Sequence, residues 1–303
     1  MNNVFYEKLF KYIALTMVII IVIIFSIFFV ELVSNSLYAF LKAGLTIIVG
    51  STWNPVKEIY GGLPFIYGTL YTSILALIIA VPLSLGVAIA SSELLPSSIT
   101  NVLNPVIEMM AAIPSIIYGM WALFVLGPIL RIYIEPFLSS TLGFLPLFRG
   151  PITGLGYLNA AIVLSIMILP IISSLMREAI GMVPKEIEEL TLALGGTRWE
   201  AIKMKIHVAK LGILGGMVLG FSRAVGETMA ILLVIGNKPS ITLSLFSSGA
   251  TIATVIANEY PEAIINPLHA SALTSLALIL FVISVTINVI FIRYIRSKIG
   301  VEI

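Results

Sequence analysis

Residues 12–31, YIALTMVIIIVIIFSIFFVE, decide the class of protein to which this chain belongs. The run from Tyr12 to Val30 is 19 residues long and holds no charged side chain. A membrane-spanning helix needs about 20 mostly apolar residues. The run exceeds the apolar core of a secretory signal, which has about 7–15 residues, and no small-residue cleavage site follows it. We therefore expect this segment to be retained as a first membrane span.

The whole chain shares this apolar character. Of its 303 residues, 59% are hydrophobic and only 11% are charged, and the mean hydropathy is +1.11. A soluble domain averages about 45–50% apolar and about 25% charged residues, so lipid must cover much of this surface. The absence of Cys excludes disulfides and thiolate chemistry. The net charge of +2 is too small to indicate a nucleic-acid partner.

Five further apolar stretches are long enough to cross a bilayer. The six expected spans cover residues 12–31, 64–91, 103–128, 155–176, 211–236 and 268–292. Pro82, Pro114 and Pro170 interrupt three of them. Broken helices can line a transport path, but proline is also common in ordinary spans. The pattern predicts an all-α membrane protein with six transmembrane helices.

The distribution of Lys and Arg predicts the orientation, because positive loops stay in the cytoplasm. One side of the six-span arrangement carries eleven cations: Lys8, Lys11, Arg177, Lys185, Arg198, Lys203, Lys205, Lys210, Arg293, Arg296 and Lys298. The other side carries five: Lys42, Lys57, Arg131, Arg149 and Lys238. We therefore expect both the N- and the C-terminus to be cytoplasmic.

Residues 177–210 are the largest segment expected in the cytoplasm, and we call them the elbow because they are typical of two helices joined by a tight turn. Pro184 is well placed to start the first helix. Gly195 and Gly196 end it, since glycine readily adopts the left-handed cap conformation. Its early turns carry three glutamates that the helix dipole favours, Glu186, Glu188 and Glu189.

Thr197 and Glu200 have the spacing of a capping box, which predicts the start of the second helix of the elbow. That helix continues into the fifth span. A helix–glycine–helix turn with a mixed charged and apolar surface suits a docking site for a partner. It equally suits a solvated amphipathic connector, and the pattern leaves both interpretations open.

The fifth span holds Arg223 and Glu227, four residues apart on one face of a helix. Counted from Leu211, Arg223 lies about 18 Å into the span, past the middle of an apolar core about 30 Å thick. A central Arg costs about 2.5–3.5 kcal/mol on insertion scales, whereas a helical ion pair contributes only about 0.2–0.5 kcal/mol. We expect the pair to face a polar path or a partner subunit; a structural ion pair that locks the helix is the alternative.

Small residues recur every four positions in the same span, at Gly212, Gly216, Gly220 and Ala224. This spacing lets helices approach closely and predicts a packing seam beside the charged pair. In the third span, Ser115 and Tyr118 follow Pro114, where a broken helix would free carbonyl groups to line a path. The residues expected to line the substrate path are therefore Arg223, Glu227, Ser115 and Tyr118.

The stretch Glu189–Ile206, ELTLALGGTRWEAIKMKI, resembles the EAA loop of ABC-importer permeases. Glu189 and Gly195 match the Glu and the Gly of that loop, whereas Leu190 and Thr191 stand where it has two alanines. Its usual Ile-x-Leu-Pro is replaced by KIHV, residues 205–208. Further stretches, in the right order along the chain, resemble the phosphate-specific permeases of the PstC type: residues 64–82, 114–127, 220–237 and 251–260.

The resemblance implies a type I ABC-importer permease fold (MetI-like) in the plasma membrane of a prokaryote. Residues 1–62 would form the N-terminal transmembrane helix and a periplasmic segment, and residues 63–297 the permease domain with the elbow as its coupling loop. The implied partners are a homologous permease (PstA type), two copies of a cytoplasmic ATPase (PstB type) and an extracytoplasmic phosphate-binding protein (PstS type). The residues expected to couple to the ATPase are Glu186, Glu189, Gly195, Gly196, Thr197, Arg198, Trp199 and Glu200.

We expect the chain to be a non-catalytic transport subunit. It has no G-x-x-x-x-G-K-[ST] loop with which to bind ATP phosphates. His207 and His269 are isolated, so we expect no metal site, and no cofactor is implied. The spans hold no H-E-x-x-H motif, no Ser/His arrangement and no Asp pair, which argues against an intramembrane enzyme.

Two other transport functions stay open. Arg223 is compatible with any anion, so a permease for another oxyanion such as molybdate, sulfate or phosphonate is the first alternative. A stand-alone secondary transporter or channel would also have six spans and an intramembrane charge. The elbow, and the lack of an inverted repeat in the sequence, favour the ABC-importer permease.

Overall fold

The computed structural model describes residues 2–299; Met1 and residues 300–303, the chain ends predicted to be cytoplasmic, lie outside the described residues. The helices are α1 (Asn2–Ala43), α2 (Thr46–Val49), α3 (Leu63–Ile89), α4 (Ser97–Ala112), α5 (Ser115–Trp121), α6 (Gly127–Ile129), α7 (Glu135–Leu142), α8 (Tyr157–Gly181), α9 (Lys185–Ala193), α10 (Arg198–Val225), α11 (Met229–Val234), α12 (Ile252–Ala263) and α13 (Pro267–Ile299). Strands β1 (Trp53–Asn54) and β2 (Ile59–Tyr60) form an antiparallel hairpin that pairs Trp53 with Tyr60.

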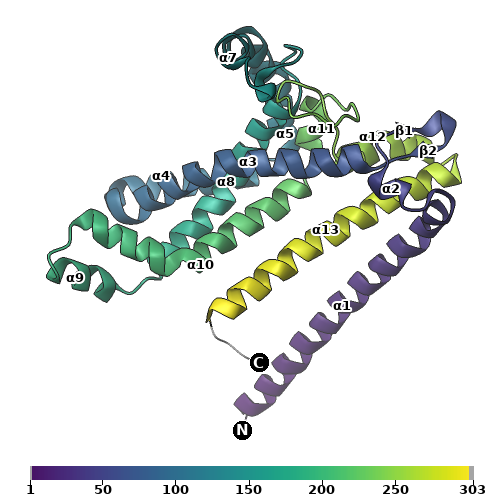
Figure 1. Cartoon of the computed structure of the whole chain (residues 1–303). Helices are drawn as coiled ribbons and strands as arrows, with labels where there is room; N and C mark the ends of the chain where they lie inside the picture. The colour runs from purple at the N-terminus through teal and green to yellow at the C-terminus, as the bar shows by residue number, and fades with distance from the viewer. Residues whose placement is uncertain (1, 300–303) are drawn as a thin grey trace.

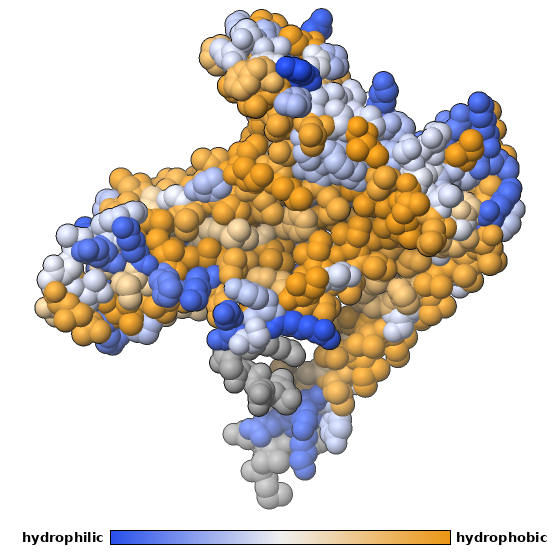
Figure 2. Space-filling model, viewed as in Figure 1, coloured by the Kyte–Doolittle hydropathy of each residue, from blue (hydrophilic) through white to orange (hydrophobic). Residues whose placement is uncertain are grey.

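Six helical segments in the described part of the chain are long and apolar enough to cross a membrane: Tyr6–Ala43, Leu63–Leu94, Ser115–Leu142, Tyr157–Gly181, Arg198–Val225 and Pro267–Ile295. The predicted all-α protein with six spans is therefore confirmed. Apolar side chains form an almost continuous surface across the middle of the molecule, while hydrophilic residues gather at its extremities (Figure 2). This distribution fits a protein whose solvent is lipid.

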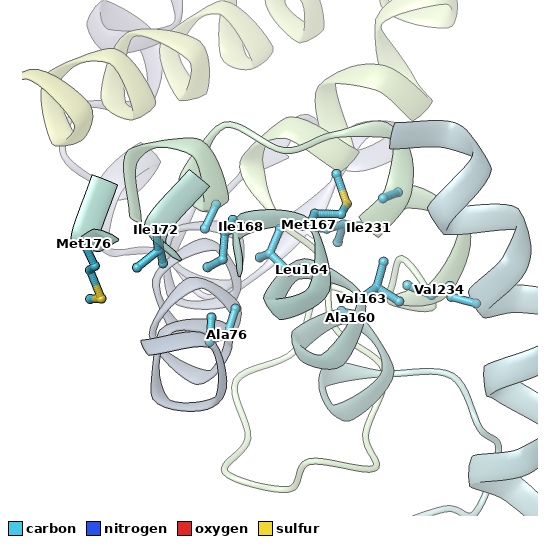
Figure 3. Packing of buried hydrophobic residues seen from close by; sticks show 14 of the residues in the cluster. Ala76, Ala160, Val163, Leu164, Met167, Ile168, Ile172, Met176, Ile231 and Val234 are labelled. Carbon is cyan, nitrogen blue, oxygen red and sulfur yellow. The ribbon is translucent and has the colours of Figure 1, made fainter. Parts of the chain in front are cut away.

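Helix α8 lies at the centre of the molecule, and α3 and α10 pack along it (Figure 1). In its most apolar stretch 61% of the residues are buried, against 0% in the corresponding stretch of α1. Side chains of α8 such as Leu164 and Ile168 lie between Ala76 of α3 and Ile231 of α11 (Figure 3). The core is therefore a layer of helices around α8.

The small residues of α10 form a seam against α8. A Cβ atom built on Gly212 would lie 2.5 Å from Cβ of Ala179, and one built on Gly220 would lie 2.5 Å from Cδ1 of Ile172. Gly216 meets α8 between these two contacts, with Leu175 Cβ 3.2 Å from its Cβ position, and Ala224 is 1% exposed. The close neighbour of the seam is therefore α8 of the same chain.

Helix α1 continues to Ala43, so residues 32–43 are helical as well and the helix extends beyond the predicted span of residues 12–31. This stretch holds no Pro or Gly, and it packs on α13 through side-chain hydrogen bonds. Ala39 N donates to Ser271 Oγ at 3.0 Å, and Ser275 Oγ donates to the Ser36 carbonyl at 3.3 Å. The hydroxyl groups of α13 thus hold the end of α1 against it. Figure 1 shows the two helices side by side.

The third span covers Ser115–Leu142, whereas the sequence predicted a span over residues 103–128. Ile113 is extended (φ −67°, ψ 127°) because it precedes Pro114, and this ends α4. Helix α4 is a separate amphipathic helix whose Glu108 pairs with Arg177 of α8 at 2.7 Å. Within this span, Pro128 and Pro136 each follow a π-helical stretch, Ala122–Leu126 and Leu130–Ile134 respectively, where the backbone already departs from the α pattern.

The fifth span also differs from its prediction, since it covers Arg198–Val225 and not residues 211–236. Helix α10 ends at Val225 with Gly226 as its C-cap, and α11 starts as a separate helix at Met229. The apolar run of α11 hides this break from a hydropathy profile. Arg223 and Glu227 therefore do not share one helical face in mid-span; Arg223 lies in the last turn of α10 and Glu227 in the break after it.

The seam generates a prediction of stability. Gly220→Ala places a Cβ atom within 2.5 Å of Ile172, and we expect it to lower the free energy of unfolding by about 1–3 kcal/mol because the helices must separate. Gly215→Ala is the matched control, since nothing lies within 4 Å of its Cβ position. Unfolding of the purified protein in mixed micelles with increasing SDS measures both variants. Equal stabilities would show that the seam is not tightly packed.

Candidate translocation path and coupling elbow

The break after α10 exposes one charge and buries its partner. Arg223 Nη2 lies 3.8 Å from Glu227 Oε2, and the exposed fractions of the two side chains are 46% and 6%. Glu227 Oε1 accepts a hydrogen bond from Ala230 N at 3.3 Å, so the carboxylate also holds the first turn of α11. The long ion-pair distance leaves the guanidinium donors of Arg223 available to a passing anion.

Helix α5 packs against α11 beside this break. A Cβ atom built on Gly119 would lie 2.9 Å from Cα of Ala230, so only glycine permits this approach. Ser115 and Tyr118 are half-buried on α5, and the Tyr118 hydroxyl donates to the Met110 carbonyl at 2.8 Å across the break between α4 and α5.

Ser115 and Tyr118 thus lie on a helix that contacts α11, whereas Glu227 precedes α11 and Arg223 lies at the end of α10. Within residues 2–299, no hydrogen bond or ion pair joins Arg223 or Glu227 directly to Ser115 or Tyr118. The Tyr118 hydroxyl already donates to the Met110 carbonyl and stabilises the break between α4 and α5. Arg223 is the one exposed residue among the four.

Three tyrosines that the sequence analysis did not single out hold the loop of residues 236–251. Each hydroxyl donates to a carbonyl of that loop: Tyr67 to Thr242 at 2.7 Å, Tyr71 to Leu243 at 2.7 Å, and Tyr157 to Ser240 at 3.1 Å. A tyrosine in an apolar span needs a partner for its hydroxyl. The four-residue spacing of Tyr67 and Tyr71 is the one signal in the sequence that both face the same neighbour.

The elbow forms as its sequence predicts. Thr197 Oγ1 accepts from Glu200 N at 3.3 Å, and Glu200 Oε2 accepts from Thr197 N at 2.7 Å, which completes a capping box at the start of α10. Gly195 has φ +84°, a left-handed conformation that turns the chain between α9 and α10. Helix α10 then continues without a break into the fifth span.

The surface of the elbow is exposed and apolar in part. Leu190 is 61% exposed, Leu194 is 82% exposed, and Trp199, with Lys203 Nζ 5.5 Å from the centre of its ring, is 53% exposed. A groove of about 700 Å³ runs between α9 and α10. Of the eight predicted coupling residues, only Gly196 is half-buried and the others are exposed.

Comparison with known protein families identifies the architecture. Residues 80–300 match the family model described as binding-protein-dependent transport system inner membrane component. The chain belongs to this family. The chain is 42% identical over 292 residues to the phosphate transport system permease protein PstC of Pasteurella multocida, which covers 95% of this chain and 91% of that protein. It is 38% identical over 292 residues to the probable phosphate transport system permease protein PstC of Methanocaldococcus jannaschii, with 95% and 93% covered.

Solved structures support the same fold. The permease of the inward-facing MetNI methionine ABC transporter superposes with a TM-score of 0.56 at 15% sequence identity, over 81% of this chain and 99% of that one. At this identity the likeness concerns the fold alone. It agrees with the predicted MetI-like architecture, and a permease of this family is the non-catalytic membrane component of its transporter.

The capping box generates a second prediction. Thr197→Ala removes the side chain that accepts from Glu200 N, and we expect a loss of about 0.5–2 kcal/mol in the local stability of the first turn of α10. Hydrogen exchange in peptides covering residues 197–203 should quicken by about 2- to 30-fold. Thr197→Ser keeps the hydroxyl and should exchange like the unaltered protein. Unchanged exchange in Thr197→Ala would contradict the role of the cap.

Proposed function

We propose that this chain is one of two permease subunits that form the path for inorganic phosphate in an ATP-driven importer. The names of its relatives in a bacterium and an archaeon support phosphate as the substrate. The observation that carries the proposal is the half-exposed guanidinium of Arg223 beside the break that ends the fifth span, while its partner Glu227 is buried. An intramembrane charge held in this way is by default a functional group.

The charges of Arg223 and Glu227 suit an anion that passes through the protein and not one that stays tightly bound. The planar fork of Arg223 matches two oxygens of a tetrahedral oxyanion. Glu227 reduces the net field of the arginine, so the anion is attracted without being trapped. The carboxylate accepts a hydrogen bond from Ala230 N, which fixes it as a counter-charge beside the guanidinium.

The sequence of this chain supports a division of ATP binding and transport between separate subunits. It has no P-loop, so ATP binding belongs to a separate subunit, and the elbow presents the exposed apolar and charged surface on which two ATPase copies would act. In this arrangement the elbow and both termini are cytoplasmic. A homologous permease completes the path, residues 63–297 form the permease domain, and segments 32–62 and 237–267 receive an extracytoplasmic phosphate-binding protein.

Transport into vesicles tests the proposal. Vesicles that hold this chain, the second permease and the ATPase, supplied with the binding protein, should accumulate phosphate only with ATP. Omission of any one component should abolish uptake. Molybdate, sulfate and phosphonate serve as competitors in excess. Uptake by this chain alone would establish a secondary transporter or channel, and preferred uptake of a competitor would establish another oxyanion as the substrate.

Substitution of Arg223 gives the sharpest prediction for the path. Arg223→Gln removes the charge, and we expect phosphate uptake to be abolished while the ATPase still copurifies with the permease pair. Arg223→Lys keeps the charge without the planar fork and should retain part of the uptake. Lys210→Gln, an exposed cation on the same helix, is the control and should transport normally. Normal phosphate uptake by Arg223→Gln would contradict the role of Arg223 in the path.

A further inference from the structure

We propose that Lys205 is a latch that ties α9 to the end of α3, so that movement of the elbow reaches the 236–251 loop through α3 as well as through α10. The inference rests on the proposed function in one respect, since it takes the ATPase as the source of the movement. Lys205 is then a positioning residue for coupling and contacts neither ATP nor phosphate.

The latch consists of one lysine between two glutamates. Lys205 Nζ lies 2.9 Å from Glu93 Oε2 and 2.5 Å from Glu188 Oε2. Glu93 belongs to the π-helical stretch Ala90–Leu94 that extends α3, and Glu188 belongs to α9. Lys205 is 8% exposed, and the side chain of Glu93 is 10% exposed. Three elements therefore meet at one ammonium group that is almost shielded from water.

A second contact joins the same elements. Arg198 Nη2, at the start of α10, donates to the carbonyl oxygen of Glu93 at 2.7 Å. The last carbonyl groups of a helix lack partners within the helix, and cations are favourable at that end of its dipole. Arg198 thus compensates a carbonyl group that the helix itself leaves unsatisfied, whereas Lys205 pairs with the side-chain carboxylate of Glu93. The first turns of α10 and the end of α3 behave as one joint.

The energetics of the latch favour a role in geometry over one in stability. A nearly buried ion pair gains little over apolar packing of the same volume, because its charges lose their hydration. Breaking such a pair is costly, since it leaves an uncompensated charge. Hydrogen bonding to Lys205 holds the pKa of Glu188 below its usual range, so this carboxylate stays ionised at neutral pH. The contribution of the pair is present above the usual pKa of a glutamate and is lost only as the pH falls through the lowered value.

Helix α3 connects the latch to the other face of the protein. The helical segment Leu63–Leu94 is 32 residues long, and Tyr67 lies about 39 Å from Glu93 along its axis at 1.5 Å per residue. Tyr67 and Tyr71 hold the carbonyl groups of Thr242 and Leu243. Helix α3 is therefore held at one end by the ion pair of Glu93 with Lys205 and at the other by the hydrogen bonds of Tyr67 and Tyr71. It links the elbow to the 236–251 loop.

Spin labels test whether α9 and α3 move together. The chain contains no Cys, so Leu94→Cys and Leu192→Cys place labels only at two exposed positions, one at the end of α3 and one on α9. Their distance distribution is measured by pulsed electron paramagnetic resonance in the assembled complex, with and without ATP. With the latch intact we expect the same narrow distribution in both states. In Lys205→Met we expect it to broaden and to shift when ATP binds.

Two variants control for charge and for general damage. Lys205→Arg keeps both ion pairs and should behave like the unaltered chain. Lys210→Met removes an exposed lysine of the same helix and should also behave like the unaltered chain. The second readout is the number of phosphate ions imported per ATP hydrolysed. In Lys205→Met it should fall by roughly 2- to 30-fold, the range expected when one element of a coupling network is lost.

If Lys205→Met fails to assemble, Glu188→Gln provides the test instead. This variant removes only the ion pair between Glu188 of α9 and Lys205 of α10. It should broaden the distances as Lys205→Met does. Unchanged distances and an unchanged transport ratio in either assembled variant would overturn the latch. The distance measurement uses ATP without phosphate, so a complex that hydrolyses ATP but does not carry phosphate would contradict the proposed function and leave the latch standing.

Discussion

The close contact between α10 and α8 is the interaction on which the rest of the structure depends. Lipid gives no hydrophobic drive to bring helices together, so association rests on packing, and small residues permit the closest approach. Gly212 and Gly220 leave no room for a side chain against α8. Because α10 is continuous with the elbow, this contact also sets where the elbow lies relative to the core.

Two breaks between helices, one just before the third span and one just after the fifth, carry the polar chemistry. In lipid, every freed backbone group needs a partner inside the protein. At the break before α5, the Tyr118 hydroxyl satisfies the Met110 carbonyl, and at the break after α10, the Glu227 carboxylate satisfies Ala230 N. The same side chains that stabilise the breaks therefore border the proposed path, and Arg223 is left with its donors exposed.

Features that depend on neighbouring residues could be predicted from the sequence, and features that depend on distant contacts could not. Hydropathy shows six spans, and the Thr197–Glu200 spacing shows a helix start, because both signals are local. The end of α10 was missed because α11 continues the apolar run beyond Gly226. The contact of Lys205 with Glu93 joins residues 112 positions apart, and no local pattern marks it.

The central claim is that the elbow and the 236–251 loop lie on opposite faces of the membrane, so that coupling and substrate entry occur at the two ends of one set of helices. Labelling of single cysteines with a membrane-impermeant maleimide tests this claim most directly, since the chain has no Cys of its own. Lys238→Cys should react in intact cells, and Met182→Cys, which replaces an 80% exposed residue in the elbow, should react only after permeabilisation. Reaction of both positions from the same side would contradict it.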